Sequence, residues 1–132
     1  MTERYAKNSG AVFSLKYHLV WCPKYRKPVL VPPVDARLKE LIGKVAAENE
    51  MTVHALEVMP DHVHVFVETD VRRAPAQIAR LLKGTTSNRL RQEFKHLRSK
   101  LPTLWSRSYF MATVGTVSEA TVRRYIESQK GK

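Results

Sequence analysis

The chain has 132 residues and a formal net charge of +11. This length is typical of a single domain, and we expect residues 1–132 to form one unit. No stretch approaches the roughly 20 apolar residues of a membrane span, the first ten residues lack the apolar core of a secretion signal, and one cysteine excludes an internal disulfide framework. We therefore expect a cytoplasmic protein without a membrane partner.

The positive charge is concentrated in one segment. Residues 1–71 carry nine Lys/Arg and nine Asp/Glu, whereas residues 72–107 carry ten Lys/Arg and a single acid, Glu93, a net charge of +9. A basic face kept for solubility would not concentrate its charge in this way. The distribution predicts a polyanionic partner, and we expect that partner to be nucleic acid.

Residues 11–21 alternate in side-chain character with the two-residue period of a β-strand. The strand leads into a basic and aromatic loop bounded by Pro23 and Pro28. Lys24 and Arg26 in this loop are candidate contacts to phosphates. The same loop is equally compatible with an ordinary exposed turn.

A helix is expected over residues 35–49, with Asp35 as its N-cap, because apolar residues recur there at helical spacing. Two further strands are expected over residues 51–58 and 63–69. The link between them, Met59-Pro60-Asp61, is short enough for an antiparallel hairpin.

Two histidines follow this turn at positions i and i+2. Val63, Val65 and Val67 alternate with them, so one face of the strand is apolar and fits a core. His62 and His64 point together to the other face. Two imidazoles so placed can reach one metal ion or one phosphate, although a His-x-His pair alone also occurs in ordinary sheets.

A second helix is expected over residues 75–94. Its apolar side would face the core, and Arg80, Lys83 and Arg91 would form a basic stripe on another side. This stripe could follow a nucleic-acid backbone, or it could be a solvated face. Gly84 is a weak point of this helix, at which a bend or break is expected if there is one.

A basic loop is expected over residues 95–102 and a fourth strand over residues 104–114, which carries Arg107 as a further candidate DNA contact. Ser118 is expected to cap a last helix over residues 119–129. The order β-α-β-β-α-β followed by α predicts an α+β, ferredoxin-like fold with a four-stranded antiparallel sheet. The first two helices would cover the valine face, which leaves the last helix to cover the histidine face.

The last helix carries Tyr125 and Gln129 four residues apart, and hence on one side of the helix. An amide oxygen and a phenol brought to the histidine pair would complete a site for Mg²⁺ or Mn²⁺, with open positions for phosphate and water. A helical tyrosine is more often an ordinary core or surface residue.

The sequence resembles the single-tyrosine HUH transposases of the smallest bacterial insertion sequences. The resemblance covers nearly the whole chain, and its five blocks occur in the family's order. The blocks are residues 17–26 (YHLVWCPKYR), 59–64 (MPDHVH), 82–84 (LKG), 104–110 (LWSRSYF) and 122–129 (VRRYIESQ).

The resemblance implies that His62, His64 and Gln129 bind the metal and that Tyr125 attacks single-stranded DNA. The products would be a 5′-phosphotyrosine and a free 3′-hydroxyl, and no nucleotide cofactor would be needed. It also implies recognition of hairpins at the element's ends by a homodimer, in which the last helix of one subunit completes the site of the other.

Three other interpretations remain open from the sequence. One is a ferredoxin-like nucleic-acid-binding module without catalysis. Another is a relative domesticated by its host to process chromosomal hairpin repeats. The third is a zinc hydrolase, because zinc prefers Cys and His ligands. Its candidate ligands are His18, Cys22, His62 and His64.

Overall fold

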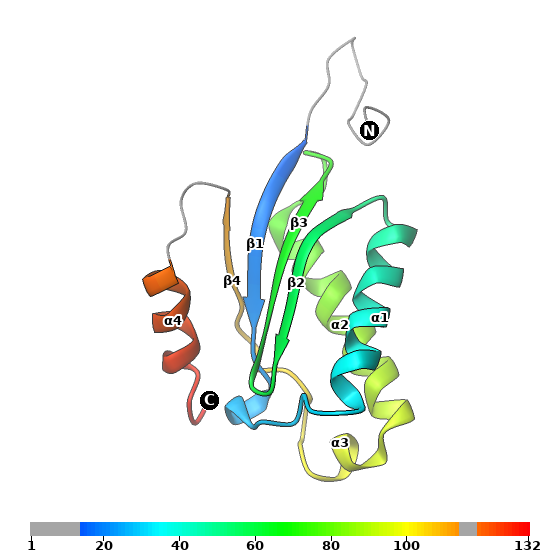
Figure 1. The fold of residues 1–132 in the computed structure, drawn as a ribbon, viewed down its shortest axis with the longest axis vertical. Coiled ribbons are helices and arrows are strands. Elements are labelled where there is room, and N and C mark those ends of the chain that lie inside the picture. Colours follow the sequence, from blue (N-terminus) through cyan, green and yellow to red (C-terminus); the bar gives the residue numbers. More distant parts are fainter. Residues whose placement is uncertain (1–13, 114–118) are drawn as a thin grey trace.

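The computed structural model describes residues 14–113 and 119–132. A four-stranded antiparallel sheet has two long helices on one face and the last helix on the other (Figure 1). The strand order is β2-β3-β1-β4, which confirms the predicted ferredoxin-like arrangement. The strands are β1 (Leu15–Trp21), β2 (Thr52–Met59), β3 (His62–Thr69) and β4 (Phe110–Thr113).

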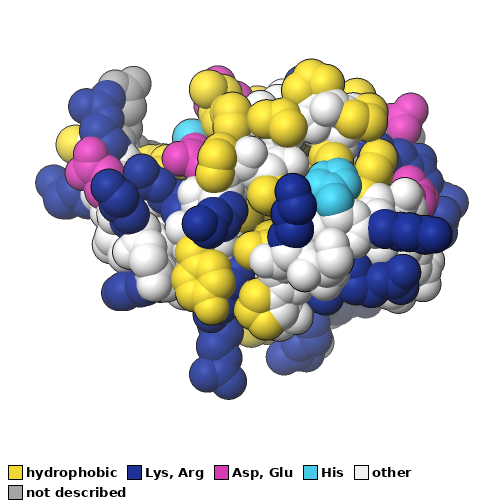
Figure 2. Space-filling model, turned by 90° about the horizontal axis from the view of Figure 1, so that it is seen from below, with side chains coloured by type: hydrophobic (Ala, Val, Ile, Leu, Met, Phe, Trp, Pro, Cys, Tyr) yellow, Lys and Arg dark blue, Asp and Glu magenta, His cyan; other side chains and the backbone are white. Residues whose placement is uncertain are grey.

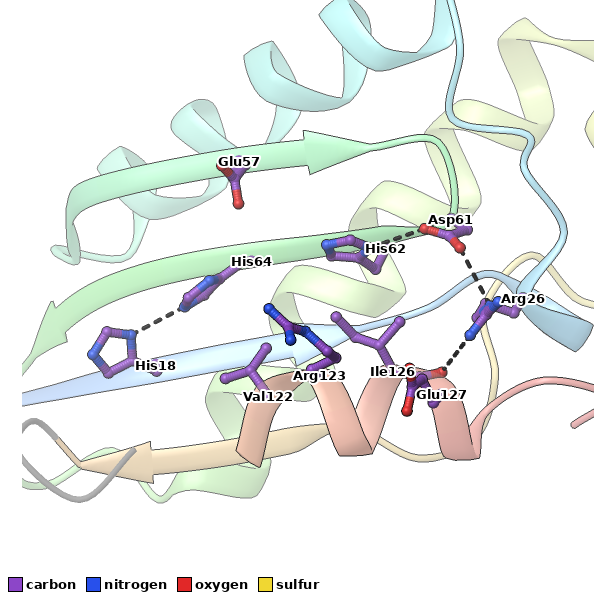
Figure 3. Close-up of a pocket in the computed structure, with 10 residues that line it drawn as sticks. All are labelled: His18, Arg26, Glu57, Asp61, His62, His64, Val122, Arg123, Ile126 and Glu127. Carbon is purple, nitrogen blue, oxygen red and sulfur yellow. Dashed lines mark hydrogen bonds and ion pairs between the residues drawn. The ribbon is translucent and has the colours of Figure 1, made fainter. Parts of the chain in front are cut away.

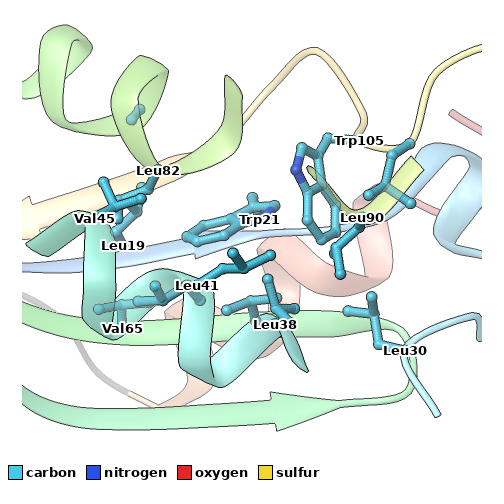
Figure 4. Close-up of a cluster of buried hydrophobic side chains, with 14 of the residues drawn as sticks. Leu19, Trp21, Leu30, Leu38, Leu41, Val45, Val65, Leu82, Leu90 and Trp105 are labelled. Carbon is cyan, nitrogen blue, oxygen red and sulfur yellow. The ribbon is translucent and has the colours of Figure 1, made fainter. Parts of the chain in front are cut away.

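Helices α1 (Val34–Glu48) and α2 (Pro75–Glu93) cover the apolar face of the sheet. The predicted valine face is buried there, and α2 is continuous through Gly84. Trp21 and Trp105 meet edge to face, with ring centroids 5.7 Å apart. Figure 4 shows the main core side chains: Leu19, Trp21, Leu30, Leu38, Leu41, Val45, Val65, Leu82, Leu90 and Trp105.

The predicted N-cap of α1 is wrong. The helix begins at Val34, and Pro33 occupies the cap position without a side-chain hydrogen bond. Asp35 lies within the first turn, where its Oδ1 accepts a hydrogen bond of 2.8 Å from the backbone N–H of Ala36. A carboxylate in the first turn still interacts favourably with the helix dipole.

The segment after α2 also differs from the prediction. The expected loop contains a short helix, α3 (Lys95–Ser99), and the expected fourth strand is reduced to β4. Trp105 turns towards α2, where its indole N–H donates to the carbonyl of Lys83 at 3.0 Å. The carbonyls of residues 106–108 then meet the Lys83 ammonium group instead of a neighbouring strand.

The last helix is α4 (Glu119–Ser128). Ser118, its predicted cap, and residues 11–13 of the predicted first strand lie outside the described residues. Within the described ranges, 14–113 and 119–132, no helix combines the length and apolar character needed to cross a membrane.

Candidate active site

A cavity of about 770 Å³ lies between the histidine face of the sheet and α4 (Figure 3). His62 and His64 point into it from β3, as their spacing predicted. Helix α4 faces them from the other side of the cavity. The lining residues are His18, Arg26, Glu57, Asp61, His62, His64, Val122, Arg123, Ile126 and Glu127.

The ring of His62 is oriented by its neighbour in the β2–β3 turn. Its Nδ1 lies 2.9 Å from Oδ1 of Asp61. The other carboxylate oxygen, Oδ2, lies 3.2 Å from Nε of Arg26. If Nδ1 carries the proton donated to the carboxylate, the lone pair of Nε2 remains available to a ligand.

The ring of His64 is packed among other rings on the same face. Its Nε2 lies 3.0 Å from Nδ1 of His18, so one of these two nitrogens donates to the other. The His18 ring stacks on Phe66, with centroids 4.7 Å apart. Burial, together with the neighbouring His18, lowers the pKa of His64, while Glu57 acts in the opposite direction. These effects favour a neutral imidazole, the form that binds metals.

Tyr125 lies in α4, whereas Gln129, predicted to be in the same helix, lies in the turn just after its last residue, Ser128; neither lines the histidine cavity. The Tyr125 hydroxyl lies 3.0 Å from Oγ of Ser108. Oε1 of Gln129 accepts hydrogen bonds from Ser106 at 2.9 Å and Ser108 at 2.8 Å. Burial raises the pKa of Tyr125 to about 12, and the hydrogen bond with Ser108 acts against this rise. In this position the phenol is neutral.

Two side chains of the predicted basic stripe, Lys83 and Arg91, hold the segment at residues 102–108 that connects α3 to β4. The Lys83 ammonium donates to the carbonyls of Ser106, Arg107 and Ser108 at 2.7, 3.3 and 3.0 Å. Burial lowers the pKa of Lys83 to about 8, whereas the three carbonyl dipoles favour its charged form. Arg91 donates to the carbonyl of Pro102 at 3.1 Å. The cationic groups of both residues are therefore engaged within the chain.

The other predicted DNA contacts lie in two places. Arg80 and Arg107 are exposed and line a second cavity of about 410 Å³. This cavity lies between α2, beside Gly84, and the segment that contains Arg107. Lys24 and Arg26 lie in the loop after β1, where the ammonium of Lys24 is 5.1 Å from the ring centroid of Tyr25. Arg26 lines the histidine cavity itself.

The zinc interpretation gains no support from the geometry. Cys22 is fully buried and does not line the histidine cavity. Burial raises the pKa of its thiol to about 12, so the thiolate that zinc requires is disfavoured. Across residues 14–113 and 119–132, no three His, Cys, Asp or Glu side chains are gathered as a metal site of that type requires.

Comparison with known proteins decides the family. The family described as "Transposase IS200 like" matches residues 11–129. The chain belongs to the IS200-like transposases. It is 40% identical over 128 residues to the ISDra2 transposase TnpA of Deinococcus radiodurans, covering 96% of this chain and 91% of that protein. The transposase for insertion sequence element IS200 of Salmonella typhimurium is 27% identical over 119 residues, which are 89% of this chain and 78% of that protein.

Solved structures agree with this family. A transposase crystal structure from Deinococcus radiodurans is 37% identical and has a TM-score of 0.87, covering 96% of this chain and 99% of that chain. A REP-associated tyrosine transposase bound to a REP hairpin has a TM-score of 0.56 at 15% identity, covering 86% of this chain and 62% of that chain. The second similarity shows the shared fold.

Sequence reasoning did not assign roles to several side chains at the transposase site. In the sequence Asp61 is a turn residue, and its position next to His62 is the signal that it can orient that ring. Ser106 and Ser108 alternate and can therefore present two hydroxyls to one side of an extended segment. The pairing of His18 with His64 depends on strand register, in which His18 lies opposite Phe66 and Val20 opposite His64.

Proposed function

We propose that this IS200-like transposase cleaves and rejoins single-stranded DNA through a tyrosine intermediate. The observation that carries the proposal is the cavity between the His62/His64 pair and α4, the helix that bears Tyr125. The imidazoles, with Arg123 facing them from α4, make the cavity suitable for a phosphate group.

In the proposed reaction, the phenolic oxygen of Tyr125 forms a bond to a DNA phosphorus atom. The bond from that phosphorus to the 3′ oxygen breaks, and the DNA 5′ end remains attached to the tyrosine. The phenolic proton passes to solvent, and the 3′ oxygen takes a proton from water. The phosphotyrosine keeps the energy of the phosphodiester, so a 3′-hydroxyl can reverse the reaction without a nucleotide cofactor.

We propose Mg²⁺ or Mn²⁺ as the cofactor, held by His62 and His64. These residues fit such an ion in part. The Asp61 carboxylate at Nδ1 of His62 is the kind of partner that metal-binding histidines usually have. Gln129, the proposed third ligand, has its amide oxygen engaged by two serines here. A bound ion would offset negative charge on the phosphate. His62 and His64 would orient the phosphate beside it.

The charge distribution supports DNA as the partner. The loop at residues 24–27 lies beside residues 104–105, where the Lys24 N–H donates to the Leu104 carbonyl at 2.8 Å. This loop, the β2–β3 turn and α3 share one end of the molecule (Figure 1). Lys and Arg side chains are spread over that end, with few acidic groups among them (Figure 2). The hairpin bound by the REP-associated transposase motivates testing hairpins as the substrate.

We propose a homodimer in which α4 of each subunit completes the other subunit's site. The position of Tyr125 supports this arrangement, because the phenol lies beside Ser108 and not in the histidine cavity of its own chain. The nucleophile must therefore move or come from another chain. A two-fold dimer would also supply the two tyrosines needed to exchange two DNA ends.

The test uses labelled single-stranded hairpins from the ends of an insertion sequence, incubated with protein and Mg²⁺. We expect a covalent adduct on a denaturing gel, and we expect Tyr125→Phe to abolish it while hairpin affinity stays within a few fold. An adduct formed by the Phe variant would show that another residue is the nucleophile.

A complementation experiment tests the shared site. A His64→Ala chain and a Tyr125→Phe chain are each expected to be inactive. In a mixed dimer, one site would combine an intact His64 with an intact Tyr125, and cleavage should partly return. If subunit exchange is verified and no activity returns, each site is assembled within one chain.

The 40% identity to the transposase of the insertion sequence ISDra2 favours a mobile-element enzyme over a domesticated relative. Transposition of a marked element by this protein in bacterial cells would test that choice. A protein that binds hairpins and moves no element would instead fit the domesticated role.

A further inference from the structure

Arg26 connects three parts of the site that are distant in the sequence. Its Nε lies 3.2 Å from Oδ2 of Asp61, whose other oxygen is 2.9 Å from Nδ1 of His62. Its Nη1 donates to the backbone carbonyl of Ile126 in α4 at 3.2 Å. Figure 3 shows these contacts as one continuous path from His62 to α4.

The backbone that carries Arg26 has an uncommon conformation. Tyr25 has φ 60° and ψ 14°, and Arg26 has φ 55°. This left-handed region is unfavourable for an L-residue other than glycine. Such conformations persist where surrounding contacts impose them, often at functional sites. Here the Arg26 N–H donates to the Pro23 carbonyl at 2.8 Å, and Pro23 forms a β-bridge with Trp105.

The chemistry of each contact fits a guanidinium better than another side chain. The planar group presents several N–H donors in fixed directions, so it can hold a carboxylate and a carbonyl at once. The Ile126 carbonyl, which also accepts a hydrogen bond from the Gln129 N–H at 3.1 Å, lies in the last turn of α4, where a positive charge is favourable. Asp61, held by Arg26 on one oxygen, accepts from His62 on the other.

We propose that Arg26 is a positioning residue that couples the docking of α4 to the ring orientation of His62. The inference rests on the proposed function only in that His62 and α4 carry the reacting groups. When α4 is docked, Arg26 is fixed at both ends, and Asp61 is held where it keeps the proton of His62 on Nδ1. Displacement of α4 removes one of the two anchors. Arg26 thus acts through Asp61 and α4, and not through a contact to DNA.

The first experiment uses the full chain without DNA or added metal. Amide hydrogen exchange reports the docking of α4, and ¹⁵N NMR at fixed pH reports which nitrogen of His62 carries the proton. We expect Arg26→Gln to speed exchange in α4 about fivefold, the effect of losing one hydrogen bond, and to reduce the Nδ1–H population of His62. Arg98→Gln, which removes an exposed arginine from α3, is the matched control and should change neither.

The coupling itself is tested by a double-mutant cycle. Asp61→Ala should also speed exchange in α4, because it removes the other anchor of Arg26. The double variant should exchange no faster than Arg26→Gln alone. The proposal would be overturned if the effects of the two substitutions on exchange in α4 multiply in the double variant. Unchanged exchange in Arg26→Gln would overturn it as well. Unchanged exchange in β1 and β3 serves as the check that each variant is folded.

A binding measurement separates positioning from a phosphate contact. Hairpin affinity is measured at several salt concentrations for the wild type, Arg26→Gln and Arg26→Lys. Positioning predicts that the salt dependence is nearly the same in all three. A slope that falls by about one unit in Arg26→Gln and is kept in Arg26→Lys would show a phosphate contact and overturn the proposal. Because the exchange experiment requires no cleavage, failure of the adduct assay would reject the proposed chemistry and leave the coupling result intact.

Discussion

Replacing Lys83 by methionine distinguishes two uses of its ammonium group. Methionine keeps a long, unbranched side chain and removes the charge and its three hydrogen bonds. If Lys83 contacts a phosphate, as the sequence predicted, the DNA affinity of the variant should depend less on salt. The slope of log affinity against log salt concentration should then fall by about one unit. The contacts to the carbonyls of residues 106–108 predict a loss of stability instead.

The size of that loss follows from the geometry. The contacts to Ser106 and Ser108, at 2.7 and 3.0 Å, are good hydrogen bonds, whereas the contact to Arg107 at 3.3 Å is long. Two hydrogen bonds to a charged group contribute roughly 3–6 kcal/mol. The cost of burying the ammonium, which lowers the pKa of Lys83 to about 8, offsets part of this.

We therefore expect Lys83→Met to lower the free energy of unfolding by about 2 kcal/mol. For a domain of this size, that corresponds to a fall in Tm of about 6–8 °C. Thermal and urea unfolding followed by circular dichroism measure the loss, and hairpin binding at several salt concentrations measures the DNA contact. Arg80→Met, which removes an exposed charge one turn earlier on α2, is the control for stability. An unchanged Tm with a flatter salt dependence would refute the structural role.

Three further predictions concern the metal, the DNA and the cysteine. His64→Ala should abolish cleavage and weaken Mn²⁺ binding by more than about 100-fold, since losing a ligand costs more than losing a group that only contacts a ligand; unchanged affinity in calorimetry would exclude the ligand role. Arg80→Ala should reduce the salt slope of hairpin binding by about one unit, and duplex of the same sequence should bind more weakly than the hairpin. The Cys22 thiol should not react with a disulfide reagent at pH 8 in the folded protein, because its pKa is about 12 and it is buried; rapid labelling without unfolding would contradict the described packing.

The sequence predicted the ferredoxin-like order of elements and the kinds of groups at the site. Alternation placed Val63, Val65 and Val67 in the core and His62 and His64 on the opposite face, because successive side chains of a strand point to opposite sides. Apolar periodicity predicted both helices that cover the valine face. These are properties of short segments, and local geometry fixes them.

The partners of the polar groups became known only from the folded chain. The sequence assigned Lys83 to DNA, but its ammonium lies against carbonyls more than twenty residues away. It placed Tyr125 with the histidine pair, but in the folded chain the phenol lies beside Ser108. Residue type and local period show which face a side chain is on. They do not show which distant donor or acceptor it meets there, because that depends on how the sheet, the connecting segment at residues 104–109 and α4 pack together.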